Sequence, residues 1–139
     1  MKLKPNDSPA FLNKAFIEIG TGKFEAAKVD IEAARKVAPS SLMVFYSQAL
    51  LDFNQGKHAA ALESLQQVLR SVPDHMPSVL LAGAVQLALG SMPQAEQHLK
   101  FYIDKDPGNV YARKLLASIL LQNRETQRAI AILSPALKS

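Results

Sequence analysis

The sequence repeats itself every 34 residues, and this period constrains the fold more than any other feature. Three glycines share the interval (Gly22, Gly56 and Gly90), and so do three prolines (Pro39, Pro73 and Pro107). Small residues recur at two further places in each copy: Ala15, Ala49, Gly83 and Ala117, then Ala27, Ala61, Ala95 and Ala129. A fixed period of about 20 to 50 residues is the signature of tandem repeat architectures. We therefore expect short helices that stack in pairs along the chain.

Each copy indicates two short helices joined by a turn. The glycines stand where the first helix ends and the chain reverses, a place that favours left-handed backbone angles. In the fourth copy Asn123-Arg124 stands there, and asparagine tolerates this conformation next best. Each proline closes a second helix, because proline keeps its predecessor out of helical backbone angles. No expected helix exceeds about four turns, so stability must come from packing on neighbours.

The second helices carry apolar residues at helical spacing. In each copy, the residues four and seven places after the second small residue are apolar or aromatic. They are Ile31 and Ala34, Leu65 and Val68, Leu99 and Tyr102, and Leu133 and Ala136. This spacing places each pair on the face that holds the small residue. Small residues on facing helices let the two axes approach to the short end of about 8 to 10 Å. We therefore expect Ala27, Ala61 and Ala95 to be buried between paired helices.

The framework G-x-[FHM]-x-x-A-x-x-x-[IL]-x-x-x-x-x-x-x-P, with a small residue seven positions before its glycine, resembles the tetratricopeptide repeat (TPR). The resemblance covers nearly the whole chain and divides it into repeats at 8–41, 42–75, 76–109 and 110–139, the last incomplete, after a leader at 1–7. It implies an all-α fold, a right-handed superhelix of antiparallel helix pairs.

Composition narrows the possibilities. With 139 residues, 48% hydrophobic and 20% charged, the chain is expected to form one folded domain. No run of about 18 uncharged apolar residues occurs, so we expect no membrane span. Cysteine is absent, which excludes disulfides and thiolate metal sites. The net charge of +4 is concentrated in the last repeat, whose five basic and one acidic residues either steer an acidic partner or form a solvated helix face.

No motif indicates catalysis. His58, His75 and His98 occupy different places in the repeat without a ligand-type partner one turn away, so we expect no metal. No nucleophile elbow, phosphate-binding glycine loop or zinc-protease motif occurs, so we expect no catalytic residues, no cofactor and no enzymatic activity. The basic cluster near the carboxyl terminus is divided between helix faces, which disfavours nucleic acid as a partner. It comprises Tyr111, Arg113, Lys114, Arg124 and Arg128.

The resemblance to TPR proteins implies a concave wall built by the first helix of each pair. The second, fifth, ninth, twelfth and thirteenth residues of each repeat line that wall in the family. The binding residues carried over on this basis are Leu12, Phe16, Met43, Tyr46, Leu50, Phe53, Asn54, Leu80, Ala84, Leu87, Tyr111, Lys114, Ser118 and Gln122. Leu50 and Leu87 are equally compatible with a role in the core between helices.

The predicted wall is apolar and aromatic at its start and polar at its end. The TPR proteins that grip acidic chaperone tails use Lys and Asn at the fifth and ninth places of the repeat. In this chain those places hold Leu12 and Phe16, Tyr46 and Leu50, Leu80 and Ala84, and Lys114 and Ser118. A co-chaperone role is therefore disfavoured. An apolar groove suits an amphipathic helix or an extended hydrophobic segment of a protein partner, with Tyr46 and Phe53 as anchors.

Two stretches, 80–109 and 112–137, look like repeats of large bacterial TPR lipoproteins that accompany the exosortase/PEP-CTERM sorting and exopolysaccharide systems. This narrower resemblance implies a segment of a cell-envelope protein, with cytoplasmic localisation as the alternative. Pro135 should make the last helix kink or stop near Ser134. Leu133, Ala136 and Leu137 should be partly exposed, as in an excised piece of a longer array.

Three hypotheses for function follow from the sequence. The first is a non-catalytic scaffold that binds a protein or peptide in its groove. The second is an architectural array that forms homo-oligomers through its exposed end. The third is the regulatory arm of an enzyme encoded outside this segment.

Overall fold

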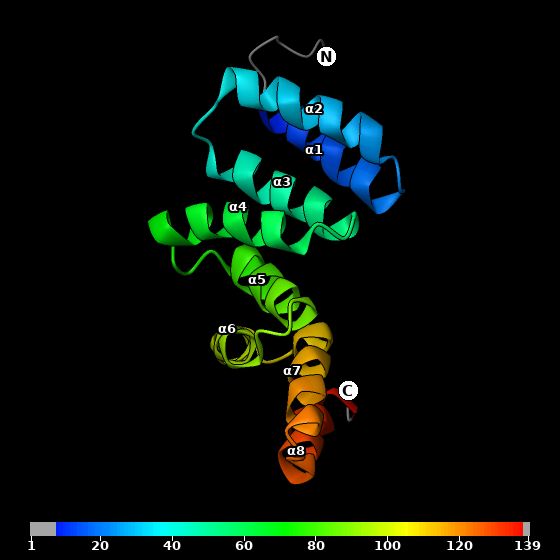
Figure 1. Cartoon of the computed structure of the whole chain (residues 1–139), viewed down its shortest axis with the longest axis vertical. Coiled ribbons are helices and arrows are strands. Elements are labelled where there is room, and N and C mark those ends of the chain that lie inside the picture. The colour runs from blue at the N-terminus through cyan, green and yellow to red at the C-terminus, as the bar shows by residue number, and fades with distance from the viewer. Residues whose placement is uncertain (1–7, 138–139) are drawn as a thin grey trace. The chain divides into compact units, whose positions relative to one another are not determined.

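The computed structural model describes residues 8–137, and within this range the chain forms helices joined by short turns, without strands (Figure 1). The predicted leader at 1–7 lies outside the described residues. The helices are α1 (Ser8–Gly20), α2 (Phe24–Val37), α3 (Leu42–Asn54), α4 (His58–Ser71), α5 (Met76–Ala88), α6 (Met92–Lys105), α7 (Val110–Gln122) and α8 (Thr126–Leu137). The predicted all-α fold of paired helices is confirmed.

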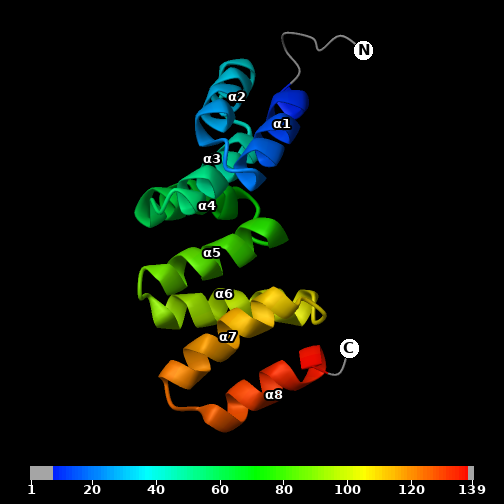
Figure 2. The same ribbon diagram turned by 90° about the vertical axis from the view of Figure 1, so that its right-hand side faces the viewer.

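The chain divides into two compact units, the first ending at Val72 and the second beginning at Pro73. In the first unit α1 pairs with α2 and α3 with α4, and α3 also packs on both α1 and α2. In the second unit α5 pairs with α6 and α7 with α8, and α7 packs on both α5 and α6. The antiparallel course of each pair can be followed in Figures 1 and 2. Each unit is therefore two consecutive repeats.

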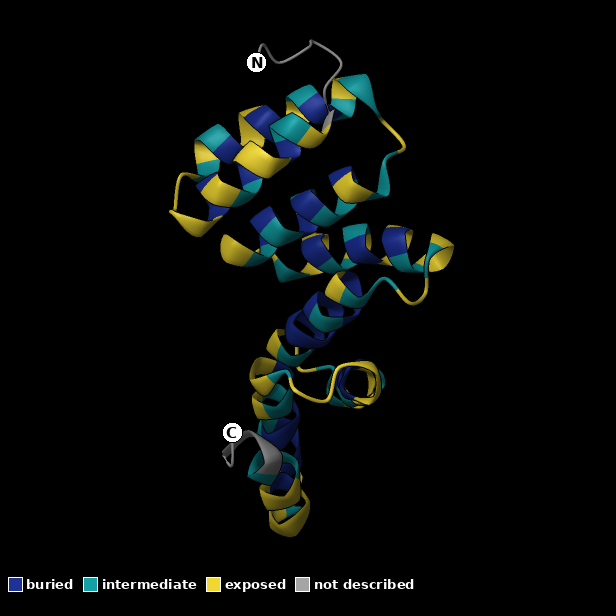
Figure 3. Ribbon diagram, turned by 180° about the vertical axis from the view of Figure 1, so that it is seen from behind, coloured by how far each residue is buried: buried dark blue, intermediate teal, exposed yellow. Residues whose placement is uncertain are grey.

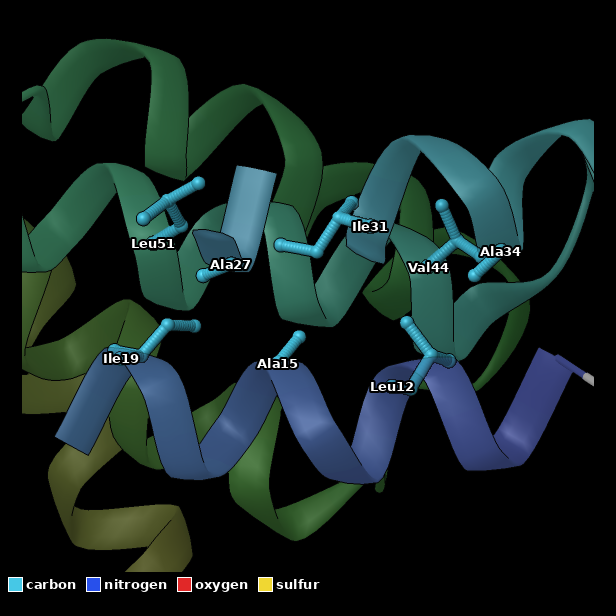
Figure 4. Close-up of a cluster of buried hydrophobic side chains, with 8 residues drawn as sticks. All are labelled: Leu12, Ala15, Ile19, Ala27, Ile31, Ala34, Val44 and Leu51. Carbon is cyan, nitrogen blue, oxygen red and sulfur yellow. The ribbon is translucent and has the colours of Figure 1, made fainter. Parts of the chain in front are cut away.

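The core of the first unit is built from small and branched side chains on α1, α2 and α3. Figure 4 shows three side chains of α1 pointing towards α2 and α3, and its cluster comprises Leu12, Ala15, Ile19, Ala27, Ile31, Ala34, Val44 and Leu51. Ala15 and Ala27 are fully buried, as are their counterparts Ala49 and Ala61 in the second repeat. The predicted small-residue contact between paired helices is thus confirmed.

The second unit keeps this contact with one variation. Ala95 is fully buried opposite Gly83, and a Cβ atom built on Gly83 would lie 2.8 Å from Cγ of Leu99. Such a distance is too short for two carbon atoms that are not bonded. Leu99 therefore occupies the space that an alanine methyl group takes at the same place in the other repeats. Glycine is needed here for close packing. In Figure 3 the buried residues of α5 form a nearly continuous dark blue stretch, which agrees with the burial of Ser78, Val79 and every residue from Leu81 to Gln86.

The turns within the pairs share one hydrogen-bonding scheme. In each, the residue after the reversal donates its N–H to a carbonyl five residues earlier: Lys23 to Glu18, Lys57 to Asp52, Ser91 to Gln86, and Glu125 to Leu120. This pattern is a Schellman cap and needs a left-handed residue. Gly22, Gly56 and Gly90 fill that place with φ angles of 78°, 79° and 80°.

The fourth turn corrects one prediction. The left-handed residue is Arg124, with a φ of 61°, and not Asn123, whose φ is −83°. The hydrogen-bonding scheme fixes the place of the reversal, so the arginine adopts an angle that asparagine would adopt at lower cost.

The sequence predicted a kink or a stop near Ser134, and the stop is wrong, because the helix continues to Leu137. Pro135 lies in its last turn, where the missing N–H removes a single helical hydrogen bond. Ser134 donates its hydroxyl to the carbonyl of Ile130 at 2.9 Å, one turn back. Leu133 is half-buried, and the side chains of Ala136 and Leu137 lie outside the described residues.

Candidate functional site

The first unit contains an apolar hollow at the predicted wall. Its volume is about 250 Å³, and we call it the inner hollow. It is lined by Pro9, Leu12, Asn13, Phe16, Ala38, Ser41 and Met43. Leu12, Phe16 and Met43 were predicted as binding residues, and the structure brings them together from α1 and the start of α3. Leu12 is only 4% exposed and forms the floor, whereas Met43 is 39% exposed at the rim.

An aromatic pair adjoins the inner hollow. The rings of Phe16 and Tyr46 meet edge to face, with centroids 6.2 Å apart and an angle of 62° between planes. Both side chains are half-buried, and Phe16 also packs against the core cluster. Edge-to-face pairs of this kind hold rings in a fixed orientation. The hollow therefore has a rigid aromatic wall as well as an apolar floor.

The other predicted residues of the first unit lie further along α3. Leu50 is half-buried against the core cluster. Phe53 stacks edge to face on His58, with ring centroids 5.5 Å apart. Asn54 is exposed and donates its side-chain amide to the carbonyl of Leu50 at 2.8 Å. None of these three lines the inner hollow.

In the second unit the predicted residues are spread along α5 and α7. Ala84 is buried, while Leu80, Leu87 and Ser118 are half-buried. The polar end of the predicted wall is exposed and comprises Tyr111, Lys114 and Gln122. Tyr111 is the one aromatic residue among these seven, so they cannot form an aromatic pair like that of Phe16 and Tyr46.

A second and larger hollow of the first unit was not predicted. It measures about 660 Å³, lies over α3 between α2 and α4, and we call it the outer hollow. Its lining is mostly polar: Arg35, Phe45, Gln48, Asp52, Ala60, Glu63, Ser64 and Gln67. The sequence did carry a signal for it. Gln48 and Asp52 are polar residues one helical turn apart on the same helix face. In the fourth repeat the place of Asp52 holds the apolar Leu120.

Polar pairs join the two helices of the first and third repeats at the same place. In the first repeat, a hydrogen bond with Asp30 and then burial raise the pKa of Glu18 above its ordinary value. Lys14, which pairs with Asp30 at 3.6 Å, opposes this shift. Oε1 of Glu18 is buried and receives no hydrogen bond from a donor among the described residues, so burial disfavours the charged form of this carboxyl group.

The equivalent pair of the third repeat is Gln86 and His98. The side-chain amide of Gln86 lies 2.7 Å from Nδ1 of His98. When its NH₂ group faces the histidine, it also reaches the carbonyl oxygens of Ala82 and Gln94. Burial lowers the pKa of His98, which agrees with a neutral ring that accepts this hydrogen bond.

Two members of the basic cluster near the carboxyl terminus, Arg113 and Arg128, are engaged within the second unit. Arg113 donates to the carbonyls of Pro107 and Ile132, at 2.6 and 2.9 Å. Arg128 pairs with Glu125 at 2.7 Å and lies 3.9 Å from Glu96. Within residues 8–137, no three His, Asp or Glu side chains come together as metal ligands, and no helix is both long and apolar enough to cross a bilayer.

Comparison with known proteins identifies the family. One model of the tetratricopeptide repeat matches residues 17–75 and 46–110, and a second matches residues 87–139. The chain belongs to the tetratricopeptide repeat family. TPR proteins are generally protein-interaction scaffolds.

Solved TPR structures share the fold. MamA from Desulfovibrio magneticus RS-1 superposes with a TM-score of 0.81 over 96% of this chain and 75% of its own, at 15% identity. YrrB, described as a TPR protein with an unusual peptide-binding site, gives 0.78 over 94% and 69%, at 16% identity. The first TPR of Spaghetti (RPAP3), bound to the HSP90 peptide SRMEEVD, gives 0.77 over 88% and 97%, at 16% identity.

Two human proteins are related in sequence. Protein O-mannosyl-transferase TMTC3 is 22% identical over 127 residues, which is 91% of this chain and 14% of that protein. FK506-binding protein-like is 29% identical over 76 residues, or 55% of this chain and 22% of that protein. The TPR chain thus spans a small part of each human relative.

Proposed function

We propose that this TPR chain is a non-catalytic scaffold that binds an apolar segment of a partner protein in the inner hollow. The observation that carries the proposal is the meeting of an apolar floor, Leu12, with the fixed aromatic pair of Phe16 and Tyr46. Half-buried aromatic side chains around a hollow are typical anchors for a partner's large apolar side chain. That TPR structures of the same fold carry peptides or a peptide-binding site supports this proposal.

The chemistry of the hollow favours an apolar ligand over an acidic one. An acidic tail such as SRMEEVD needs cationic or amide side chains to hold its carboxylates. The corresponding places here are Leu12, Phe16, Tyr46 and Leu50. Lys14, the cation of α1 in this region, is paired with Asp30. A segment that presents Leu, Phe or Trp would bury its side chain against Phe16 without stranding a charge.

Selection of peptides tests the proposal. The purified chain is exposed to a displayed library of random dodecapeptides, and selected sequences are synthesised for calorimetry. We expect enrichment of Leu, Phe and Trp, and a loss of about tenfold or more in affinity on Phe16→Ala, since truncating an aromatic anchor costs about 2 kcal/mol or more.

Ile17→Ala is the matched control. Ile17 is the next residue of α1, is 68% exposed and does not line the inner hollow. It should leave affinity within about twofold. Enrichment of acidic peptides, or equal losses for Phe16→Ala and Ile17→Ala in folded proteins, would refute the proposal.

The wider role is proposed from the resemblance of 80–109 and 112–137 to bacterial envelope TPR lipoproteins. On this basis the parent protein works in the cell envelope, in exopolysaccharide export or protein sorting. Fractionation of the native host, followed by detection of the full-length protein, tests this role. Recovery of the protein in the cytoplasmic fraction alone would contradict it.

One observation favours self-association as a second candidate. Ile17 is 68% exposed, whereas its counterparts Leu51 and Ile119 are 1% and 0% exposed. Leu51 is covered because α3 packs against the preceding helix pair. A second copy that covers Ile17 in the same way would bury this side chain. Sedimentation over a range of concentrations would show association that Ile17→Lys abolishes, and a monomer at every concentration would exclude this candidate.

A further inference from the structure

Helix α3 presents two faces of opposite chemistry. Successive helical residues are rotated by about 100°, so residues three and four apart share a face. One face carries the predicted wall residues, Met43, Tyr46 and Leu50. The opposite face carries residues of the outer hollow, Phe45, Gln48 and Asp52. Figures 1 and 2 show α3 lying between α2 and α4, so both helices can contribute to the second face.

A chain of hydrogen bonds crosses the outer hollow. Arg35 of α2 pairs with Glu32 and donates from Nη2 to Oε1 of Gln48 at 2.9 Å. Gln48 in turn donates from Nε2 to Oδ1 of Asp52 at 3.0 Å. The guanidinium is therefore already neutralised by Glu32 and held away from Asp52 by an intervening amide.

Two carboxylates of the outer hollow are left without a cation. Asp52 is 6% exposed and receives its described side-chain hydrogen bond from the neutral Gln48. Glu63 is exposed on α4, and among the described residues neither acid has a basic partner. A buried carboxylate without a counterion is costly, so the site carries an unmet preference for positive charge.

The other repeats fill the place of Asp52 differently. Glu18 lies beside Asp30, which pairs with Lys14, whereas Gln86 is neutral and pairs with His98, and Leu120 is apolar. Among these four residues, Asp52 is the carboxylate with a neutral residue at the matching place on the paired helix. Ser64 stands there, where the first repeat has Asp30. The unpaired acid is therefore a property of the second repeat and not of the repeat framework.

We propose that the outer hollow is a second binding site, which receives an arginine side chain from an extended segment of a partner protein. The guanidinium lies against Asp52 and Glu63, and the half-buried ring of Phe45 forms a wall on which its plane can stack. Arginine fits better than lysine, because its planar fork can serve two carboxylates at once. The volume of about 660 Å³ also admits residues flanking the arginine.

Four peptides of identical sequence except for a central Arg, Lys, Leu or Glu test this site. Each is titrated into the isotope-labelled chain while amide signals are followed by NMR. The Arg peptide should shift the signals of Gln48, Asp52 and Ser64, bind more tightly than the Lys peptide, and weaken with added salt. Leu and Glu peptides should leave these signals in place.

Asp52→Asn and Glu63→Gln should each weaken the Arg peptide by about tenfold. Glu25→Gln removes the same charge from α2 at a place that does not line the outer hollow, and should have no effect. Glu63 is exposed, so its variant remains informative even if Asp52→Asn unfolds. The proposal would be overturned if the Arg peptide bound no more tightly than the Leu peptide or the Lys peptide. It would also be overturned if Glu63→Gln left the affinity for the Arg peptide unchanged. Phe16→Ala should leave binding of the Arg peptide unchanged, because Phe16 lines the inner hollow. A failure of the proposed arginine site can therefore be told apart from a failure of the proposed function of the inner hollow.

Discussion

The two units obey the same 34-residue period but differ in what they place between their helices. In the first unit, buried carboxyl groups stand at Glu18 and Asp52, and aromatic side chains gather at the inner hollow. In the second unit the same places hold Gln86 and Leu120, and Leu99 packs directly onto Gly83. The repeat therefore fixes the backbone and the small-residue contacts, while the remaining positions are free to create local sites.

The largest difference to test is the packing of Leu99 on Gly83. Leu99→Ala should destabilise the chain by about 2 to 5 kcal/mol, as should Leu65→Ala in the second repeat, because both side chains are fully buried. Gly83→Ala alone should be destabilising, since overpacking costs about 1 to 3 kcal/mol against a gain of about 1 kcal/mol in helix propensity. Urea denaturation measures each change.

The double variant sharpens this test. Once Leu99 is truncated, the added methyl group of Gly83→Ala has room, so Gly83→Ala should stabilise the Leu99→Ala protein by about 1 kcal/mol. Purely additive effects of the two substitutions would show that Leu99 does not occupy the space beside Gly83.

The turns provide a test of intermediate size. Arg124 adopts the left-handed angle that glycine adopts in the other three turns. Arg124→Gly should therefore stabilise the chain by about 1 kcal/mol, and Gly56→Arg should destabilise it by about 1 to 2 kcal/mol. If both substitutions raise the melting temperature, or both lower it, the fourth turn does not share the left-handed position of the other three.

The buried polar pairs should make the two units respond to pH in opposite directions. The raised pKa of Glu18 contributes stability that is complete below its ordinary pKa and is lost as pH rises through the folded value. The lowered pKa of His98 contributes stability that is complete above about pH 6.5 and is lost as pH falls from there towards the folded value.

Matched substitutions separate the two effects in melting temperatures recorded from about pH 4 to 8. Glu18→Gln keeps a donor for Asp30 without a charge, so it should stabilise the chain at neutral pH and change little at pH 4. His98→Gln should remove the loss of stability below about pH 6.5. A Glu18→Gln protein no more stable than the unsubstituted protein at neutral pH would refute the first assignment, and a loss of stability below about pH 6.5 that persists in His98→Gln would refute the second.

The fold could be predicted because its determinants are periodic. Ala27, Ala61 and Ala95 are buried as their spacing required, and the three glycines take the left-handed angle. Arg124 and Pro135 were misjudged, because in both places the hydrogen bonds of the repeat outweigh the preference of a single residue.

The sites were predictable only in part. Family positions pointed to Leu12, Phe16 and Met43, which line one hollow, but could not show that Leu12 is the floor or that Phe53 packs on His58. The outer hollow depends on side chains from three helices. Their meeting follows from how α2 and α4 flank α3, and the spacing of Gln48 and Asp52 in the sequence indicates the contribution of α3 alone.

Binding in the inner hollow is tested most directly by mapping a selected apolar peptide on the chain by NMR. Amide signals around Phe16, Met43 and Tyr46 should shift on binding, and Phe16→Ala should abolish those shifts while the protein remains folded. Shifts confined to α7 and α8, with the signals of α1 and α3 unmoved, would contradict binding in the inner hollow.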